Sequence, residues 1–155
     1  MDTLEKQLQI LATYLSPEEV YNEKVSAAGS YWHIQHTLLT IEKIFESLSQ
    51  SDPKAYSPSF SLSKVFVFST GNIPRGRAQS PASVRPTERA TFEQLHHELQ
   101  KVRSLLPAFI SLPPHAYFNH PVLGLLTTRE AMRFLAIHTR HHNKILRDIV
   151  RTSLK

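Results

Sequence analysis

Two histidines near the C-terminus, His138 and His142, have the spacing that lets two side chains bind one metal ion. Residues four apart lie one turn apart on the same face of a helix, and paired histidines at this spacing recur in metal sites. Both lie in the stretch 133–147, which we expect to be helical. A metal site would need at least a third ligand from elsewhere in the chain.

The apolar pattern of this stretch points the two histidines toward the protein interior. At about 100° per residue, the large apolar side chains fall in one arc, with His138 and His142 near its middle and the charged residues opposite. Buried imidazoles are costly unless each finds a partner, and a divalent ion offsets this cost by taking a lone pair from each neutral ring. His141 lies at the edge of the arc, where a hydrogen-bonding or solvent-facing role is expected.

His36 is the best candidate for the third ligand. It lies in a predicted helix over about residues 30–49, on a second stripe with Trp32 and Leu39 that is opposite the main apolar stripe. A helix with two such stripes is covered on both sides, as in a helical bundle. The alternative for His36 is a core-edge histidine bonded to a neighbouring helix. His33 is expected to point elsewhere, and His96 is the reserve ligand.

The absence of cysteine limits the chemistry that this chain can perform. With no cysteine among 155 residues, disulfides, thiolate nucleophiles, zinc fingers and iron–sulfur clusters are excluded, and any metal must be held by histidine, aspartate or glutamate. The nine histidines are more than a chain of this size usually carries. The length suits a single domain over residues 1–155.

Charge and hydropathy bear on location and partners. No apolar run approaches the roughly 20 residues of a membrane span, and the N-terminus lacks a secretory signal, so we expect a soluble, cytoplasmic protein with no membrane association. The formal charge of +5 would suit an anionic partner. The basic residues are nevertheless spread over helix faces and one loop, which makes nucleic acid an unlikely partner.

The remaining elements follow from periodicity and from capping residues. Helices are predicted over 3–15, 30–49, from Thr87 or Thr91 to a stop or kink at Pro107, and over 127–151. Shorter helices are predicted at 16–25 and at 62–69, although the valines and phenylalanines of 62–69 would also suit a strand. Residues 115–124 are expected to form a loop. The segment 71–86 is either a surface connection or a basic flap over a site, since it carries Arg75, Arg77 and Arg85. These elements predict an all-α fold, with four main helices in a bundle.

Four short motifs, in order, resemble the DinB-like superfamily, and most closely a branch known only as a domain of unknown function. They are Trp32-His-Ile-Gln-His-Thr-Leu-Leu-Thr-Ile-Glu42, Ile73-Pro-Arg-Gly-Arg-Ala78, His120-Pro-Val-Leu-Gly-Leu-Leu-Thr127 and His138-Thr-Arg-His-His142. The resemblance spans roughly residues 25–150. Its specificity comes from the order and spacing of the motifs.

This resemblance implies a four-helix bundle with one long crossover that binds a divalent metal, most often zinc or nickel, with iron as a further possibility. The ligands that it implies are His36, His138 and His142, the same residues that periodicity favours. Some relatives are metal-dependent thiol transferases, so a small-molecule thiol or an electrophile is the implied substrate; a hydrolase is also compatible. Members of the superfamily commonly form homodimers, and a non-catalytic, metal-stabilised stress-response or interaction protein is the alternative.

The general base of such an enzyme stays unassigned. No paired carboxylates lie near the predicted ligands in the sequence, and His120, His141 and Glu42 are weak candidates. Arg75 and Arg77 are candidates for attracting an anionic co-substrate, because of their charge and their place in the loop.

Overall fold

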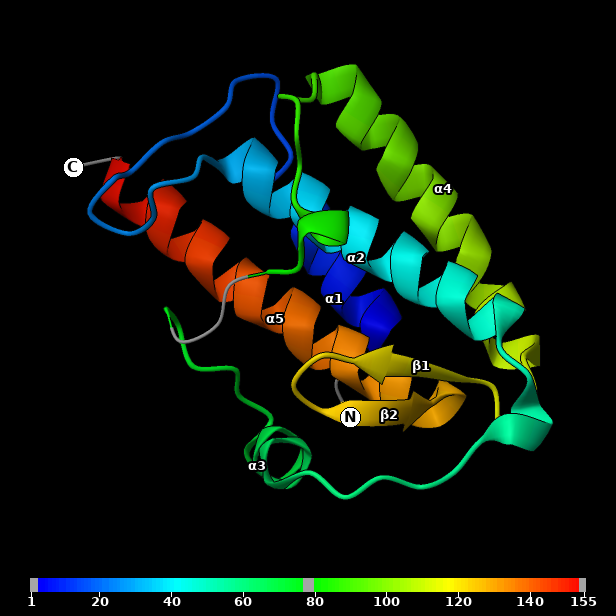
Figure 1. Ribbon diagram of the computed structural model, residues 1–155. Helices are drawn as coiled ribbons and strands as arrows, with labels where there is room; N and C mark the ends of the chain where they lie inside the picture. Colours follow the sequence, from blue (N-terminus) through cyan, green and yellow to red (C-terminus); the bar gives the residue numbers. More distant parts are fainter. Residues whose placement is uncertain (1–2, 77–79, 154–155) are drawn as a thin grey trace.

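The computed structural model describes residues 3–76 and 80–153, which form a mainly helical protein (Figure 1). Within these residues the α-helices are α1 (Leu4–Ala12), α2 (Ser30–Gln50), α3 (Leu62–Thr70), α4 (Phe92–Ser111) and α5 (Thr128–Ser153). Two short 3-10 helices, η1 (Pro53–Ala55) and η2 (Ala82–Val84), lie in the connections. Strands β1 (Tyr117–His120) and β2 (Gly124–Thr127) precede α5. None of the described helices is both long and apolar enough to cross a membrane.

The long helices share one hydrophobic core. α2 packs against α4 and α5, and α1 also packs against α5 and α4. One face of α2 supplies Ile34, Leu38, Ile41 and Leu48, each at most 1% exposed. The expected second stripe of α2 is also covered, since His36 is only 2% exposed. α2 is therefore enclosed on two sides, as its sequence predicts.

The starts of α3, α4 and α5 carry capping side chains. The Thr91 side chain accepts a hydrogen bond from the backbone of Gln94, whose side chain accepts one from Thr91 in return, which closes a capping box at the start of α4. Before α5, the Glu130 carboxylate accepts from the Thr127 backbone N–H at 3.0 Å. α3 begins at Ser61, whose side chain accepts from the Lys64 N–H. These helices occupy the ranges that were predicted, to within a few residues.

Pro107 does not stop α4, so of the two expected effects, a stop or a kink, the stop is wrong. The helix continues to Ser111, although a proline removes one backbone hydrogen bond and crowds the preceding turn. The last turn carries Phe109, which is fully buried and packs on Phe45 with ring centroids 4.8 Å apart. Burial of this ring offsets the cost of the proline.

Two further expectations are wrong. The 115–124 loop is part of an antiparallel hairpin, in which Phe118 pairs with Leu126 and both side chains are buried, so the fold is not entirely helical. Gly124, with a φ of +75°, supplies the left-handed backbone conformation after the turn. The 16–25 segment forms no helix, because Val20 exchanges its backbone hydrogen bonds with Ser30 at the start of α2.

Candidate metal centre

α2 holds His36 in a fixed orientation. The ring is buried, and its Nδ1 lies 2.7 Å from the carbonyl oxygen of Val84 in η2. A carbonyl can only accept, so Nδ1 must carry the proton and Nε2 keeps its lone pair. The indole of Trp32 stacks on the same ring at a centroid distance of 5.0 Å. His36 is thereby presented as a neutral imidazole whose Nε2 keeps its lone pair.

α5 brings His138 and His142 to the same place. Their ring centroids lie 4.6 Å apart, as expected for residues one turn apart on one helix face. His142 is 6% exposed, whereas His138 is only partly buried. The Nδ1 atom of His138 is nevertheless buried and has no hydrogen-bond partner among residues 3–76 and 80–153. A buried ring nitrogen in this state is costly.

The three predicted ligands converge. One ring nitrogen from each of His36, His138 and His142 can be chosen so that all three lie within 4.8 Å of one another. The centroid of the His36 ring lies 5.2 Å from that of His138 and 4.8 Å from that of His142. Three histidines from two helices are therefore close enough to hold one metal ion.

The surroundings keep all three rings neutral. Burial lowers the pKa of His36, although the hydrogen bond to the Val84 carbonyl raises it in part. Burial lowers the pKa of His138 and His142 much further, and the neighbouring histidines add to the effect. Neutral imidazole is the form that coordinates a metal, so this donor set could bind a metal ion.

His33 belongs to the same cluster, which corrects the expectation that it points elsewhere. It is 4% exposed, and its Nδ1 lies 3.1 Å from Nδ1 of His142. Its Nε2 lies 2.9 Å from the hydroxyl oxygen of Ser26. The sequence did contain a signal, because His33 and His36 are three residues apart and so share one side of α2.

Of the other predicted site residues, His96 and Glu42 lie outside the cluster. His96 is exposed on α4 and contacts the ring of Phe92, so it does not replace His36. Glu42 forms an ion pair of 2.9 Å with Lys101 of α4.

His120 and His141 lie closer to the three histidines. The ring of His141 meets that of His142 edge-on at 5.1 Å, and burial lowers its pKa. The Nδ1 of His120 accepts the backbone N–H groups of Val122 and Leu123 in the hairpin turn. That nitrogen is therefore not free to act as a base.

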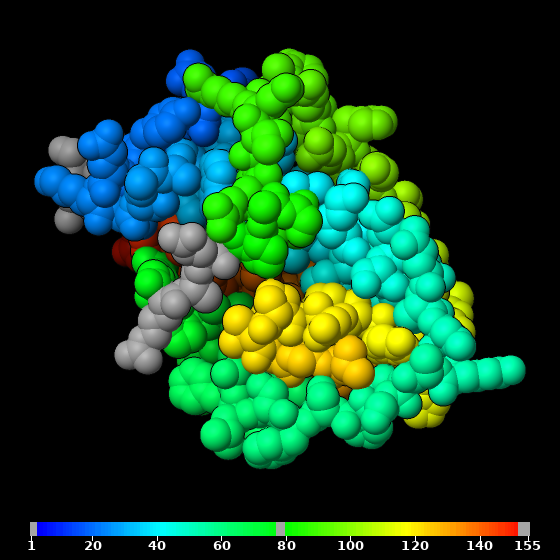
Figure 2. Space-filling model, in the orientation of Figure 1, coloured from blue at the N-terminus to red at the C-terminus, as the bar shows by residue number. Residues whose placement is uncertain are grey.

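The described residues 80–86 before α4 contact His36 and so do more than connect two helices. Figure 2 shows the part around η2, in green, lying against α2, in cyan. Besides the Val84 carbonyl, Ser80 places its hydroxyl oxygen 3.5 Å from Nε2 of His36. Arg75 forms an ion pair of 2.8 Å with Asp148 of α5. Arg77 lies outside the described residues.

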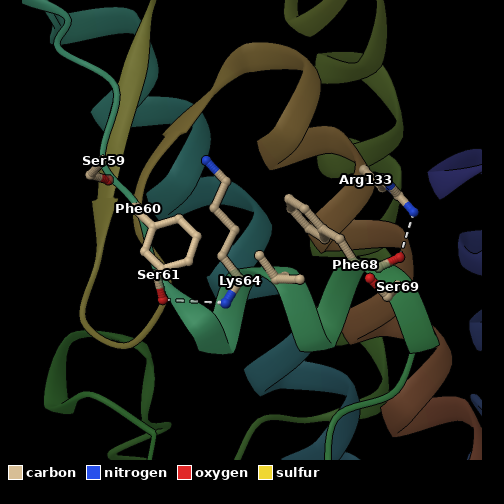
Figure 3. A pocket seen from close by; sticks show the side chains of 8 residues that line it. Ser59, Phe60, Ser61, Lys64, Phe68, Ser69 and Arg133 are labelled. Atoms are coloured by element: carbon tan, nitrogen blue, oxygen red, sulfur yellow. Dashed lines mark hydrogen bonds between the residues drawn. The ribbon is translucent and has the colours of Figure 1, made fainter.

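A separate surface pocket of about 420 Å³ lies along α3. Its wall includes Phe60, Lys64, Phe68 and Arg133, and Arg133 donates a hydrogen bond to the Phe68 carbonyl oxygen at 2.6 Å (Figure 3). None of the three converging histidines lines it. The pocket is therefore distinct from the candidate metal centre.

Comparisons with known proteins add no assignment: no family model matches the chain, and neither a curated protein nor a solved structure matches it.

Proposed function

We propose that this protein binds one divalent metal ion through His36, His138 and His142, and that the ion serves a metal-dependent transferase or hydrolase activity. The convergence of the three ring nitrogens within 4.8 Å carries this proposal. The unpartnered Nδ1 of His138 supports it, because burial of that atom is otherwise unexplained.

The groups around the three proposed ligands make contacts that suit this function. The Val84 carbonyl fixes the proton of His36 on Nδ1 and so directs Nε2 toward the other two rings. Phe134, whose ring lies 5.6 Å from that of His138, limits the access of water on that side. When bound, a divalent ion with three imidazole ligands keeps open positions and supplies the Lewis acidity that activates a thiol or a water molecule.

We also propose that the chain is a DinB-like bundle. The helices that carry the histidines support this, since one ligand comes from α2, the second long helix in the expected order, and two come from the last helix. The long connection from α2 to α4, which contains α3 and η2, suits the crossover of that fold. A small-molecule thiol or an electrophile is the substrate class that follows.

Metal content is the first test. Purified protein incubated with zinc or nickel and then desalted should retain about one ion per chain, as three ligands at one site require. His138→Ala should lose the ion. His96→Ala is the matched control, because this exposed histidine of α4 lies outside the cluster and its removal should leave the metal content unchanged. Full retention of metal by His138→Ala would refute the assignment.

Turnover separates the enzyme from a metal-stabilised structural protein. The structural role has one observation in its favour, since His36 and His142 are only 2% and 6% exposed. Metal-loaded protein should be screened for conjugation of small thiols to electrophiles and for ester hydrolysis. A rate that disappears with a chelator and with His138→Ala supports catalysis. Stable metal binding without any such rate would favour the structural role.

A further inference from the structure

His33 is the fourth histidine of the cluster and is not one of the three proposed ligands. Building on the metal-binding function above, we propose that His33 is a positioning residue: it accepts a hydrogen bond from Nδ1 of His142 and thereby leaves Nε2 of His142 as the atom that binds metal. Ser26 completes the chain by accepting a hydrogen bond from Nε2 of His33. The contacts are 3.1 Å between the two Nδ1 atoms and 2.9 Å from Ser26 Oγ to His33 Nε2.

The protons in this chain can be arranged in only two orders while both rings stay neutral. In one, His142 donates from Nδ1 to His33, and His33 donates from Nε2 to Ser26. In the other, the Ser26 hydroxyl donates to His33, and His33 donates from Nδ1 to His142. The second order places the remaining proton of His142 on Nε2, which then cannot bind a metal. Only the first order is compatible with a metal ligand at His142.

Two features of the surroundings suit the first order. The backbone N–H of Ala28 donates to Ser26 Oγ at 3.1 Å, which ties the serine in place beside His33. His36 has an equivalent arrangement, in which the Val84 carbonyl accepts from Nδ1 and the lone pair stays on Nε2. Two of the three proposed ligands therefore have an acceptor behind them. For His142 the acceptor is another histidine.

His33 is buried, so it does not act as a solvent-facing histidine. The side chain is 4% exposed, and the Trp32 ring meets it edge-on with centroids 5.2 Å apart. Both of its ring nitrogens are used within the protein, one by Ser26 and one by His142. Such partners behind a metal ligand typically change metal affinity by about 10–100-fold when they are removed.

The tautomer of His142 in metal-free protein tests this directly. Long-range ¹H–¹⁵N spectra of chelator-treated, ¹⁵N-labelled protein at neutral pH should show His142 protonated on Nδ1. His33→Leu should shift His142 toward the Nε2-protonated form. His33→Asn, whose side-chain oxygen can accept in place of the imidazole nitrogen, should restore the Nδ1-protonated form. Wild-type His142 protonated on Nε2, or a tautomer unaffected by His33→Leu, would overturn the proposal.

Zinc affinity gives a second readout, measured by competition with a chromophoric chelator. His33→Leu should weaken binding by about 10–100-fold, and His33→Asn should recover most of that loss. His97→Leu, at an exposed position on α4, is the control and should bind as the wild type does. If the wild type binds zinc and His33→Leu binds it equally well, His33 has no positioning role and the metal site stands. If the wild type binds no metal, the metal function fails and the tautomer alone decides the role of His33.

Discussion

His138 is the residue at which the absence of a metal should be most costly. Its Nδ1 is buried and finds no partner in the described part of the chain, whereas the Nδ1 atoms of His36 and His142 contact the Val84 carbonyl and His33. An unsatisfied buried polar atom costs about 1–3 kcal/mol. The metal-free protein therefore carries a local cost that a ligand at this nitrogen would remove.

This cost predicts that His138→Leu changes the stability of the protein in opposite directions, relative to the wild type, with and without metal. In chelator, His138→Leu should be at least as stable as the wild type, because it removes the unsatisfied nitrogen and keeps an apolar side chain beside Phe134. In excess zinc, the wild type should gain stability by mass action and the variant should not. Thermal unfolding under both conditions checks this. A variant much less stable than the wild type in chelator would show that the ring is satisfied without metal.

His120 predicts a loss of stability in acid. Burial lowers its pKa from 6.5 to about 4, and its Nδ1 already accepts two backbone N–H groups of the hairpin turn. As the pH falls from 6.5 toward 4, the unfolded chain takes up a proton at this position before the folded protein does. The free energy of unfolding should therefore fall across this range, by at most about 1.4 kcal/mol for each pH unit. Above pH 6.5, His120 is neutral in both the folded and the unfolded chain and adds no pH dependence to stability.

Urea unfolding of metal-free protein at several pH values measures this slope. His120→Asn should flatten it, since the asparagine oxygen can accept the same N–H groups and does not titrate. Equal slopes for the wild type and His120→Asn would assign the acid sensitivity to the other buried histidines.

At the scale of elements, Glu130 joins α5 to the hairpin and to α3. Its carboxylate accepts the Thr127 N–H at the start of α5 and lies 2.6 Å from the ammonium group of Lys64. Lys64 also donates to the carbonyl oxygen of Leu125 in β2. One ion pair, with its two side chains 14% and 30% exposed, thus holds three elements together.

Glu130→Ala should therefore destabilise the protein by about 1–3 kcal/mol, through loss of a helix cap and of a partly buried ion pair. Glu130→Gln keeps an oxygen for the Thr127 N–H and should lose less. The exposed ion pair between Lys43 and Glu46 supplies the control, and Glu46→Gln should change stability by less than about 1 kcal/mol. Urea titration of the three variants measures these differences. An equal loss for Glu130→Ala and Glu130→Gln would assign the whole effect to the ion pair.

The long helices were predictable because each carries a regular apolar period, and α4 and α5 also carry capping side chains at their starts. The hairpin was not, since strands of four residues are too short to show a clear alternation. The failure at 16–25 has another cause: the Ser16-Pro-Glu-Glu pattern fits a helix start, but the backbone of Val20 bonds to Ser30 instead. Tertiary hydrogen bonds of this kind leave no periodic signal in the sequence.

Within the candidate site, periodicity identified His36, His138 and His142 because each lies near the middle of a buried stripe. His33 was missed because it was judged by the apolar stripes of α2 and not by its distance from His36. Ser80 and Val84 could not be found in this way. They approach His36 through the irregular segment before α4, whose path is fixed by tertiary contacts.

At the scale of the whole molecule, α3 and its flanks expose an apolar surface. Phe60 and Leu62 are 82% and 76% exposed, and half of Val65 and Phe66 is also exposed. Exposed apolar side chains gathered on one segment commonly mark an interaction site. We propose that a second copy of the chain covers it, in line with the homodimer that the resemblance implies.

Phe66→Glu should then shift the protein from dimer to monomer, because it places a charge within the apolar contact. Ile110→Glu is the matched control, since Ile110 is equally apolar and 78% exposed but lies near the end of α4. Light scattering coupled to size-exclusion chromatography measures both masses. A monomeric wild type, or a dimer that survives Phe66→Glu, would remove α3 from the interface.

The stacking of Trp32 on His36 has a consequence for how this protein can be studied. Trp32 is the single tryptophan of the chain, and its ring lies nearly parallel to that of His36, at an interplanar angle of 14°. All indole emission from the protein therefore originates beside the proposed site. Copper or nickel bound at His36 should quench this emission through the stacked rings, and filled-shell zinc should leave most of it. The chain thus carries its own optical reporter of metal occupancy, with no added dye.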